Sequence, residues 1–273
     1  MKSNRIQELK RLLLDKKHVT NAELCRTFNV SIETVRRDLN LLEKEGFLRK
    51  VYGGAKLVDN PIHATDPEKW DTRIGQNEEN KRSVAMRVAE LIPDGCTVYL
   101  DIGTSIFEML PALKKKQNLT VLTNSLRNAS ELGVCDNLTV YCIGGVIRTD
   151  RLVSSGFFAS DFLTYFSHID YAVLSCDGFS PEKGTTEYSI ELAMLKKTVV
   201  EKSNYVIVAV DHTKFGIPAS CLCCGIEKIN ALVTDETPLP ADVATMREKG
   251  VTLVVSEVSG AEKTEAYGKV LKV

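Results

Sequence analysis

The sequence contains no long apolar run. No stretch of its 273 residues approaches the roughly 20 consecutive apolar residues that a membrane-spanning helix requires. The first stretch, MKSNRIQELKRLLL, mixes basic and polar residues with a helical repeat of leucines, which is unlike a secretory signal peptide. We therefore expect a cytoplasmic protein with no membrane partner.

Nucleotide and metal motifs are also missing. No P-loop and no Gly-x-Gly-x-x-Gly fingerprint occurs, so nucleotide binding is not expected. Most of the eight cysteines stand alone in apolar segments, as Cys96, Cys142 and Cys176 do, where cysteine serves as a small hydrophobe. The one cluster, CLCC at 221–224, has no second ligand pair at zinc spacing. We expect reduced, partly buried thiols, no metal and no cofactor.

The net charge of −1 hides an asymmetry between the two ends of the chain. Residues 1–58, called the head below, contain 13 Lys and Arg against 7 Asp and Glu, a balance of +6. The remainder contains 22 against 29, a balance of −7. A chain of this length accommodates two domains. A basic head on an acidic body is typical of a protein whose head alone meets a polyanion.

Periodicity predicts three helices in the head. Apolar residues at helical spacing place the first near residues 6–13. Thr20 and Glu23 form a capping box for a short second helix. Ser31 is placed to cap a third helix that runs to about Gly46. The pair of helices at about 20–39 is arranged as a helix-turn-helix.

The third helix has an apolar stripe of Val35, Leu39 and Leu42 and a polar opposite face. In a helix-turn-helix the second helix enters the major groove, where Arg and Asn contact base edges. Asp38 lies near the inner edge of the stripe, so we expect it to pair a basic group or orient an arginine. The opposite face and its flanks carry Glu33, Thr34, Arg36, Arg37, Asn40 and Lys44.

A basic hairpin follows the third helix. FLRKV alternates as a strand, YGG turns and AKLV returns, which predicts a two-stranded wing that reaches phosphates or the minor groove. The alternative is a solvated charged helix in a small three-helix domain. Because the caps, the polar face and the hairpin agree, we favour DNA binding through Thr34, Arg36, Arg37, Asn40, Lys44, Arg49, Lys50 and Tyr52.

The segment SIETVRRDLNLLEKEGFLRKVYGGA resembles the helix-turn-helix and wing of the DeoR family of bacterial transcriptional regulators. Its Thr-Val-Arg-Arg-Asp-Leu core and its Gly-Gly-Ala end are characteristic of that family. The resemblance implies a winged helix whose recognition residues correspond to Thr34, Arg36, Arg37 and their neighbours.

A connector is predicted at 59–76, since residues 59–73 are polar and contain two prolines. Trp70 is its expected docking anchor. From Asn77 an amphipathic helix begins, and the body (77–273) then repeats one pattern: a β-branched run followed by a loop of small polar residues. This alternation predicts an α/β fold with a doubly wound, mostly parallel sheet.

The loops after the predicted strands gather at the carboxyl edge of such a sheet, where open α/β folds bind ligands. Ser and Thr hydroxyls with backbone N–H groups suit a phosphate, and carboxylates and Asn suit sugar hydroxyls, so a phosphorylated sugar is the predicted ligand. The alternative is that strand-to-helix turns favour these residues for local reasons. The candidates are Asp101, Gly103, Thr104, Ser105, Thr123, Asn124, Ser125, Gly144, Gly145, Asp177, Glu187, Asp211 and Lys214.

The loops DIGTS, LTNS, IGG, CDG…KGTTE and VDHTKFG resemble those of the DeoR effector domain. The resemblance implies a site that includes Gly184, Thr185 and Thr186, a sugar phosphate that usually relieves repression, and a fold related to ribose-5-phosphate isomerase. In the first loop Thr104-Ser105 stands where the family commonly has Thr-Thr or Ser-Thr. CLCC and the tail after Glu236 match no family pattern.

Kinship with the isomerase suggests an enzyme as the alternative function. DGFSPEKG resembles the isomerase Asp-Gly-Ala-Asp-Glu motif at Asp177 and Gly178. Ser180 and Pro181 stand where the motif has its acids, and a hydroxyl is a poor general base at neutral pH. We therefore expect no catalysis, and predict a ligand-responsive repressor of a sugar operon. Symmetric operators favour a homo-oligomer, either a dimer or a tetramer.

Overall fold

The structure is a computed structural model that describes residues 2–44, 47–57, 70, 74–75, 77–217, 219–256 and 266–267. Most of the predicted connector at 59–76 lies outside these residues. Within the described part, no helix is both long enough and apolar enough to cross a membrane. The head contains α1 (Lys2–Lys16), α2 (Asn21–Phe28) and α3 (Ile32–Lys44), with strands β1 (His18–Thr20), β2 (Leu48–Val51) and β3 (Gly54–Leu57).

Both predicted helix caps of the head are present. The Oγ1 atom of Thr20 accepts a hydrogen bond from the Glu23 N–H at 3.1 Å. The Oγ atom of Ser31 accepts one from the Thr34 N–H at 3.3 Å. Each cap satisfies a backbone donor that has no partner inside its helix. The predicted stop of the third helix, Gly46, lies outside the described residues, and α3 ends at Lys44.

The wing is a three-stranded sheet in the order β1-β3-β2, one strand more than predicted. β2 and β3 pair antiparallel, as expected, and β1 pairs with the other side of β3. Gly54 permits this contact, because a Cβ atom there would lie 2.1 Å from the carbonyl oxygen of Val19. A three-residue strand shows too little alternation for sequence reasoning to detect.

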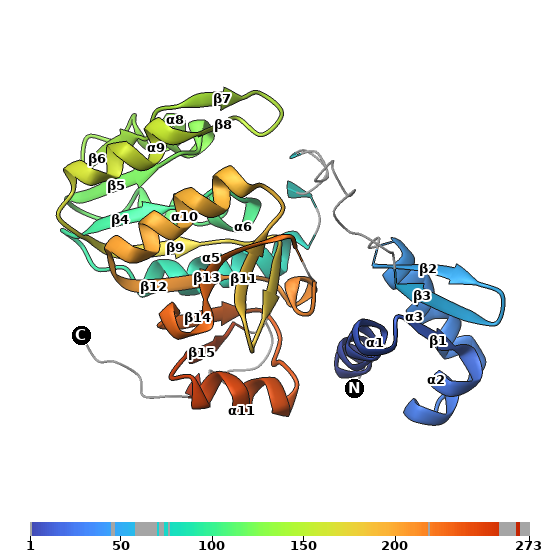
Figure 1. Cartoon of the computed structure of the whole chain (residues 1–273). Coiled ribbons are helices and arrows are strands. Elements are labelled where there is room, and N and C mark those ends of the chain that lie inside the picture. The colour runs from blue at the N-terminus through green and yellow to red at the C-terminus, as the bar shows by residue number, and fades with distance from the viewer. Residues whose placement is uncertain are drawn as a thin grey trace.

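The body is built on an eight-stranded sheet in the order β16-β15-β14-β12-β9-β4-β5-β6 (Figure 1). All neighbours pair parallel except β15 and β16, which confirms the predicted doubly wound α/β fold. The strands are β4 (Thr97–Leu100), β5 (Leu119–Thr123), β6 (Leu138–Cys142), β9 (Ile169–Leu174), β12 (Ser203–Ala209), β14 (Ala231–Thr234), β15 (Thr252–Val255) and β16 (Ala266–Tyr267).

Helices cover both faces of this sheet (Figure 1). Successive strand residues alternate between the two cores: Tyr99 and Val208 belong to one, whereas Val98 and Ile207 belong to the other. Strands buried on both faces explain the continuous apolar runs of the sequence. One face carries α5 (Glu78–Glu90), α6 (Thr104–Phe107), α7 (Leu110–Leu113) and α8 (Leu126–Leu132); the other carries α9 (Phe157–Phe162), η2 (Leu163–Tyr165), α10 (Ile190–Lys202) and α11 (Pro240–Glu248).

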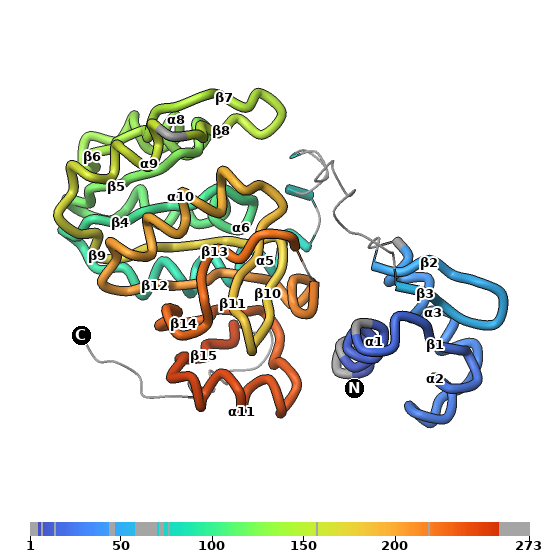
Figure 2. Tube along the Cα trace, in the orientation of Figure 1, coloured from blue at the N-terminus to red at the C-terminus, as the bar shows by residue number. Residues whose placement is uncertain are grey.

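Two smaller sheets flank the main one. The hairpin of β10 (Gly178–Ser180) and β11 (Gly184–Glu187) pairs with β13 (Cys221–Gly225), and these strands lie beside one another in Figure 2. The CLCC run is therefore the start of a strand. The remaining elements are the hairpin β7 (Val146–Arg148) and β8 (Val153–Ser155), and the short helices η3 (His212–Lys214) and η4 (Ile226–Lys228).

One cysteine differs from the sequence predictions, and the C-terminal tail extends them. Cys142 is exposed rather than buried, because β6 is the edge strand of the sheet. Cys96 and Cys176 are buried, as expected. The tail beyond Glu236, which matched no pattern, supplies α11, strand β15 and the edge strand β16.

Candidate functional site

The outer face of α3 is a polar surface. Arg36, Arg37 and Asn40 are exposed and Thr34 is half-buried, while the apolar stripe on the inner side of the helix is almost fully buried. The side chain of Lys44 lies outside the described set. This face has the size and the donors needed to read base edges in a major groove.

Asp38 faces inward and holds two helices together. It is 2% exposed and accepts hydrogen bonds from Arg5 Nε at 2.6 Å and from Arg5 Nη2 at 3.2 Å. These bonds raise the pKa of the Arg5 guanidinium. The prediction that Asp38 is structural is confirmed, and the bidentate pair fixes α3 against α1.

The wing is tied to the recognition helix by Lys50. Its ammonium donates to Asn40 Oδ1 at 2.6 Å and lies 3.1 Å from Glu43 Oε2, and its backbone N–H donates to Glu43 Oε1 at 2.9 Å. Arg49 and Tyr52 are exposed, with Tyr52 at the tip of the hairpin. Helix and wing thus form one continuous surface, on which seven of the eight predicted DNA contacts have described side chains.

A cavity with an empty volume of about 500 Å³ opens at the carboxyl edge of the main sheet. Five of the predicted ligand residues line it: Gly103, Thr104, Ser105, Asp211 and Lys214. Sequence reasoning missed Asn77, Lys81, Ser175 and Thr213 in its lining. A polar residue at the first turn of a helix, such as Lys81, carries no sequence signal that separates a ligand contact from a solvated charge.

The loop after β4 is shaped by Gly103. This residue has a φ of +137°, and a Cβ atom there would lie 2.8 Å from Ser175 Oγ, so only glycine fits. The turn brings the Thr104 and Ser105 side chains to the cavity. Two lysines, Lys81 and Lys214, line the same space. Hydroxyls with two ammonium groups suit an anionic ligand.

Beneath the cavity lies a fully buried ion cluster. The Lys196 ammonium lies 2.7 Å from Asp101 Oδ2, bonds to Glu187, and donates to the carbonyl of Ser175 at 2.9 Å. Burial lowers the pKa of Lys196, but the charges of Asp101 and Glu187 outweigh it and leave the pKa raised. Burial raises the pKa of Glu187, and the neighbouring Asp177 adds to that shift.

Asp101 connects this cluster to the cavity wall. Its Oδ2 atom accepts hydrogen bonds from the backbone N–H of Ser175 at 2.8 Å and from Ser175 Oγ at 3.0 Å. Asp101 and Glu187, both predicted ligand residues, are 0% and 3% exposed. The structure places them behind the cavity-lining residues, where Asp101 positions Ser175 and Glu187 pairs with Lys196.

The loop after β5 also lies in the scaffold. Thr123, Asn124 and Ser125 are buried. Asn124 accepts from the Tyr99 hydroxyl at 3.0 Å, and Ser125 caps α8 by accepting from the Asn128 N–H at 3.2 Å. These side chains do not line the cavity.

The other predicted ligand residues lie in hairpins and turns. Thr185 contacts Cys223 at 3.0 Å, Thr186 accepts from the Ala219 N–H at 3.2 Å, and Asp177 accepts from the Tyr188 N–H at 3.1 Å. Gly184 is the first residue of β11, and Gly144 with Gly145 precedes β7. None of the six residues Gly144, Gly145, Asp177, Gly184, Thr185 and Thr186 lines the cavity.

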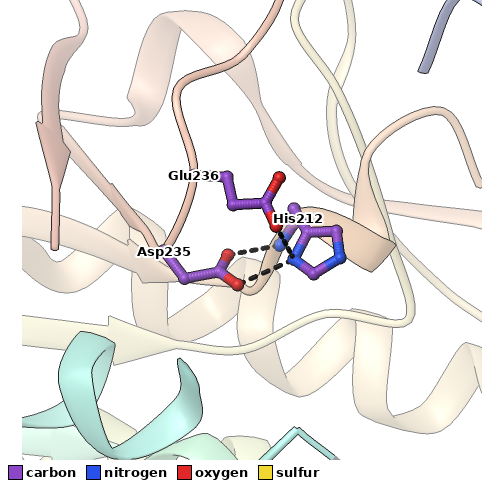
Figure 3. A group of neighbouring side chains, drawn as sticks. All are labelled: His212, Asp235 and Glu236. Carbon is purple, nitrogen blue, oxygen red and sulfur yellow. Dashed lines mark hydrogen bonds and ion pairs between the residues drawn. The ribbon is translucent and has the colours of Figure 1, made fainter. Parts of the chain in front are cut away.

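One cluster in the described part of the chain has donor atoms close enough to hold a metal ion: His212, Asp235 and Glu236, within 4.8 Å of one another (Figure 3). Asp235 already accepts bonds from the His212 N–H at 2.6 Å, from the His212 ring at 2.7 Å and from Asn80 Nδ2 at 2.5 Å. This pattern favours a clamp that holds η3 to the end of β14.

Two family models match this chain, each over a different range of residues. Residues 5–60 match a model described as the DeoR-like helix-turn-helix domain, and residues 76–236 match the DeoR C terminal sensor domain. The transcriptional regulator GolR of Listeria innocua is 30% identical over 90% of this chain and 95% of its own length. The glycerol-3-phosphate regulon repressor of Escherichia coli is 32% identical over 81% of this chain and 86% of its own.

Among solved structures, ribose 5-phosphate isomerase A from Neisseria gonorrhoeae aligns with a TM-score of 0.39 at 17% identity, over 52% of this chain and 55% of that one.

Proposed function

We propose that this chain, which belongs to the DeoR family of DNA-binding transcriptional regulators, represses a sugar-metabolism operon and is released by a phosphorylated sugar. The observation that carries the ligand assignment is the cavity at the sheet edge, where hydroxyls lie beside Lys81 and Lys214. A relative is named for the glycerol-3-phosphate regulon, which agrees with a small phosphorylated effector.

DNA recognition is assigned to the outer face of α3 and to the wing. Arg36, Arg37 and Asn40 supply base-edge donors, while Arg49 and Tyr52 supply backbone contacts. The side chains in this surface are exposed and lie on both sides of the Lys50 bridge. We propose residues 1–58 as the DNA-binding domain, 59–76 as linker and 77–273 as the sensing domain of a cytoplasmic homo-oligomer.

Regulation requires linkage between the two sites. The sugar phosphate must bind the weak-DNA state better than the tight-DNA state, because a ligand with equal affinity for both shifts nothing. Because operators with two-fold symmetry match dimeric proteins, half-sites are expected about 10 bp apart, or a multiple of that.

The DNA assignment is tested by incubating the full chain with sheared DNA of its source genome at near-physiological salt and sequencing the retained fragments. Enrichment of a few sites with paired half-sites supports it. Retention without sequence preference would show that α3 does not read bases. Genes beside an enriched site name the phosphorylated sugars to test as releasing agents.

The ligand assignment is tested with Lys214→Ala, which removes one cavity ammonium. We expect DNA affinity without ligand to stay within about twofold, and the sugar-phosphate concentration for half release to rise at least about tenfold, since one charge-assisted contact is lost. Lys197→Ala, an exposed lysine of α10, is the control. Unchanged release by Lys214→Ala would remove this lysine from the site.

An isomerase activity is the alternative, and we propose that the chain has none. Ser180, at the position of a catalytic acid, accepts bonds from the backbone N–H groups of Glu182 and Lys183, each at 3.3 Å. A turn-forming hydroxyl does not replace a carboxylate base. Steady turnover of an aldose or ketose phosphate that Asp177→Asn abolishes would overturn this part of the proposal.

A further inference from the structure

The segment Asp211–Ile217 lies between the ligand cavity and the head. Asp211, Thr213 and Lys214 line the cavity at the sheet edge. Phe215, Gly216 and Ile217 line a second cavity, with an empty volume of about 1000 Å³, together with Lys10 and Arg11 of α1. The two halves of one seven-residue segment therefore face two different spaces.

The segment contacts the head directly through Lys10. This lysine is 2% exposed, and its ammonium donates to the carbonyl oxygen of Thr213 at 3.3 Å. The same ammonium lies 5.5 Å from the centre of the Phe47 ring, within the head. A buried cation is thus shared between the core of the head and a residue of the ligand cavity.

Apolar and ionic contacts surround this hydrogen bond. Ile217 packs against the apolar core of the head. Arg11 lies 3.5 Å from Asp242 and 3.6 Å from Glu182, both residues of the body. The head therefore meets the body along α1, which is the helix of the head nearest to the body in Figure 1.

The segment is held firmly at both ends. At its start, His212 is clamped by Asp235 (Figure 3). At its end, Gly216 N–H donates to the Phe179 carbonyl at 2.9 Å, and the Phe179 and Phe215 rings pack edge to face with centroids 5.0 Å apart.

Gly178 allows the backbone at the end of the segment to pack directly against β10, because glycine has no side chain. A Cβ atom at Gly178 would lie 1.9 Å from the carbonyl oxygen of Ile217. A segment packed in this way transmits a displacement instead of absorbing it.

We infer that the segment Asp211–Ile217 carries ligand occupancy from the cavity to the DNA-binding surface. The contacts form a continuous path: Thr213 bonds to Lys10 of α1, and Arg5 of the same helix bonds to Asp38 of the recognition helix. A ligand that moves Lys214 and Thr213 when it binds also displaces α1 through Lys10. The displacement of α1 then moves α3 through the bond between Arg5 and Asp38. This inference rests on the proposed release by a phosphorylated sugar.

The contact itself is tested without ligand. Lys10→Met keeps the apolar stem and removes the donor. In the full chain, amide hydrogen exchange of residues 212–217 should become at least about twofold faster, because the packing partner in the head is weakened. Lys202→Met is the control, since Lys202 donates to the Phe166 carbonyl at 2.9 Å within the body. Exchange unchanged in Lys10→Met would overturn the inference.

Coupling is tested with an enriched genomic fragment and D-fructose 1-phosphate, D-ribose 5-phosphate and glycerol 3-phosphate as probes. The readout is the ratio of DNA dissociation constants with and without the probe that releases the wild type. Lys10→Met and Ile217→Ala should each reduce this ratio at least about fivefold, while each variant binds DNA alone and probe alone within about threefold of the wild type.

The outcomes separate the two proposals. Release by both variants equal to that of the wild type overturns the coupling path and leaves the regulator function intact. Failure of all three probes to release the wild type counts against the proposed effector class, and the exchange experiment then decides the contact independently. Loss of probe binding in Lys10→Met would also overturn the path, because Lys10 would then belong to the ligand site.

Discussion

The two surfaces proposed to bind DNA and ligand are constructed in opposite ways. On the head, exposed side chains project from one helix and one hairpin, and their direction follows from the local backbone. On the body, the ligand cavity is assembled from α5 and from loops after three strands, β4, β9 and β12. The first surface depends on periodicity within 25 residues; the second depends on how distant segments pack.

The largest loss of stability should follow from disrupting the buried ion cluster of Lys196, Asp101 and Glu187 under the cavity. Lys196→Met leaves two buried carboxyl groups without their cation, and we expect a loss of about 3–5 kcal/mol in the free energy of unfolding. Urea denaturation of the full chain measures it. Lys197→Met, one residue further on an exposed position, should change stability by less than about 0.5 kcal/mol. Equal effects would show that the cluster is not the source of stability.

Replacing an exposed arginine of the recognition helix should change DNA binding and leave the free energy of unfolding unchanged. Arg37→Ala should weaken operator binding by about 1–3 kcal/mol and relax the preference at one base pair, as measured by binding to a set of operators with single base changes. The half-buried Arg87 of α5, which lies outside the head, provides the control, since its loss should leave DNA binding unchanged. A uniform loss over all sequences would instead identify a phosphate contact for Arg37.

Two serines that cap helices, the exposed Ser31 in the head and the buried Ser125 in the body, allow the two regions to be compared directly. Ser31→Ala removes an exposed cap of α3 and should cost about 0.5–1 kcal/mol, whereas Ser125→Ala removes a buried cap of α8 and should cost about 1–2 kcal/mol, because its donor cannot reach water. Thermal unfolding of each variant measures the difference. A Ser125→Ala variant of normal stability that no longer binds sugar phosphate would return Ser125 to the ligand site.

The smallest effect concerns the His212 clamp. Burial would lower the pKa of His212, but the bond and charge of Asp235, with Glu236 and Asp211, raise it above 6.5. Burial would raise the pKa of Asp235, yet the bonds from His212 and Asn80 lower it below 3.8.

The stability contributed by protonated His212 is present below pH 6.5 and is lost as the pH rises through the raised value. That of ionised Asp235 is present above pH 3.8 and is lost as the pH falls through the lowered value. His212→Gln should thus be destabilised relative to wild type by less than about 1 kcal/mol, most strongly between these values. A difference in unfolding free energy that does not change with pH would contradict the clamp.

Sequence reasoning succeeded where a side chain's environment is set by its own element. The caps at Thr20 and Ser31, the inward position of Asp38 and the parallel sheet all follow from helical or strand periodicity. It could not separate Ser105, which lines the cavity, from Ser125, which caps a helix. Each of these serines lies in a small polar loop that comes directly after an apolar strand. Packing alone distinguishes them. Trp70, expected as an anchor, packs on Phe107 with ring centroids 5.5 Å apart and under Arg127.

The two halves of the segment Asp211–Ile217 line different cavities, which bears on how this regulator can be re-engineered. The side chains of Asp211, Thr213 and Lys214 line the cavity proposed for the ligand, whereas the head contacts the backbone carbonyl of Thr213 and the side chain of Ile217. Exchanging the side chains at positions 211–214 together with 104–105 would retarget the molecule as a biosensor to a new metabolite while its output to the promoter stays the same. The side chains that line the cavity can thus be replaced without changing the contacts between the segment and the head.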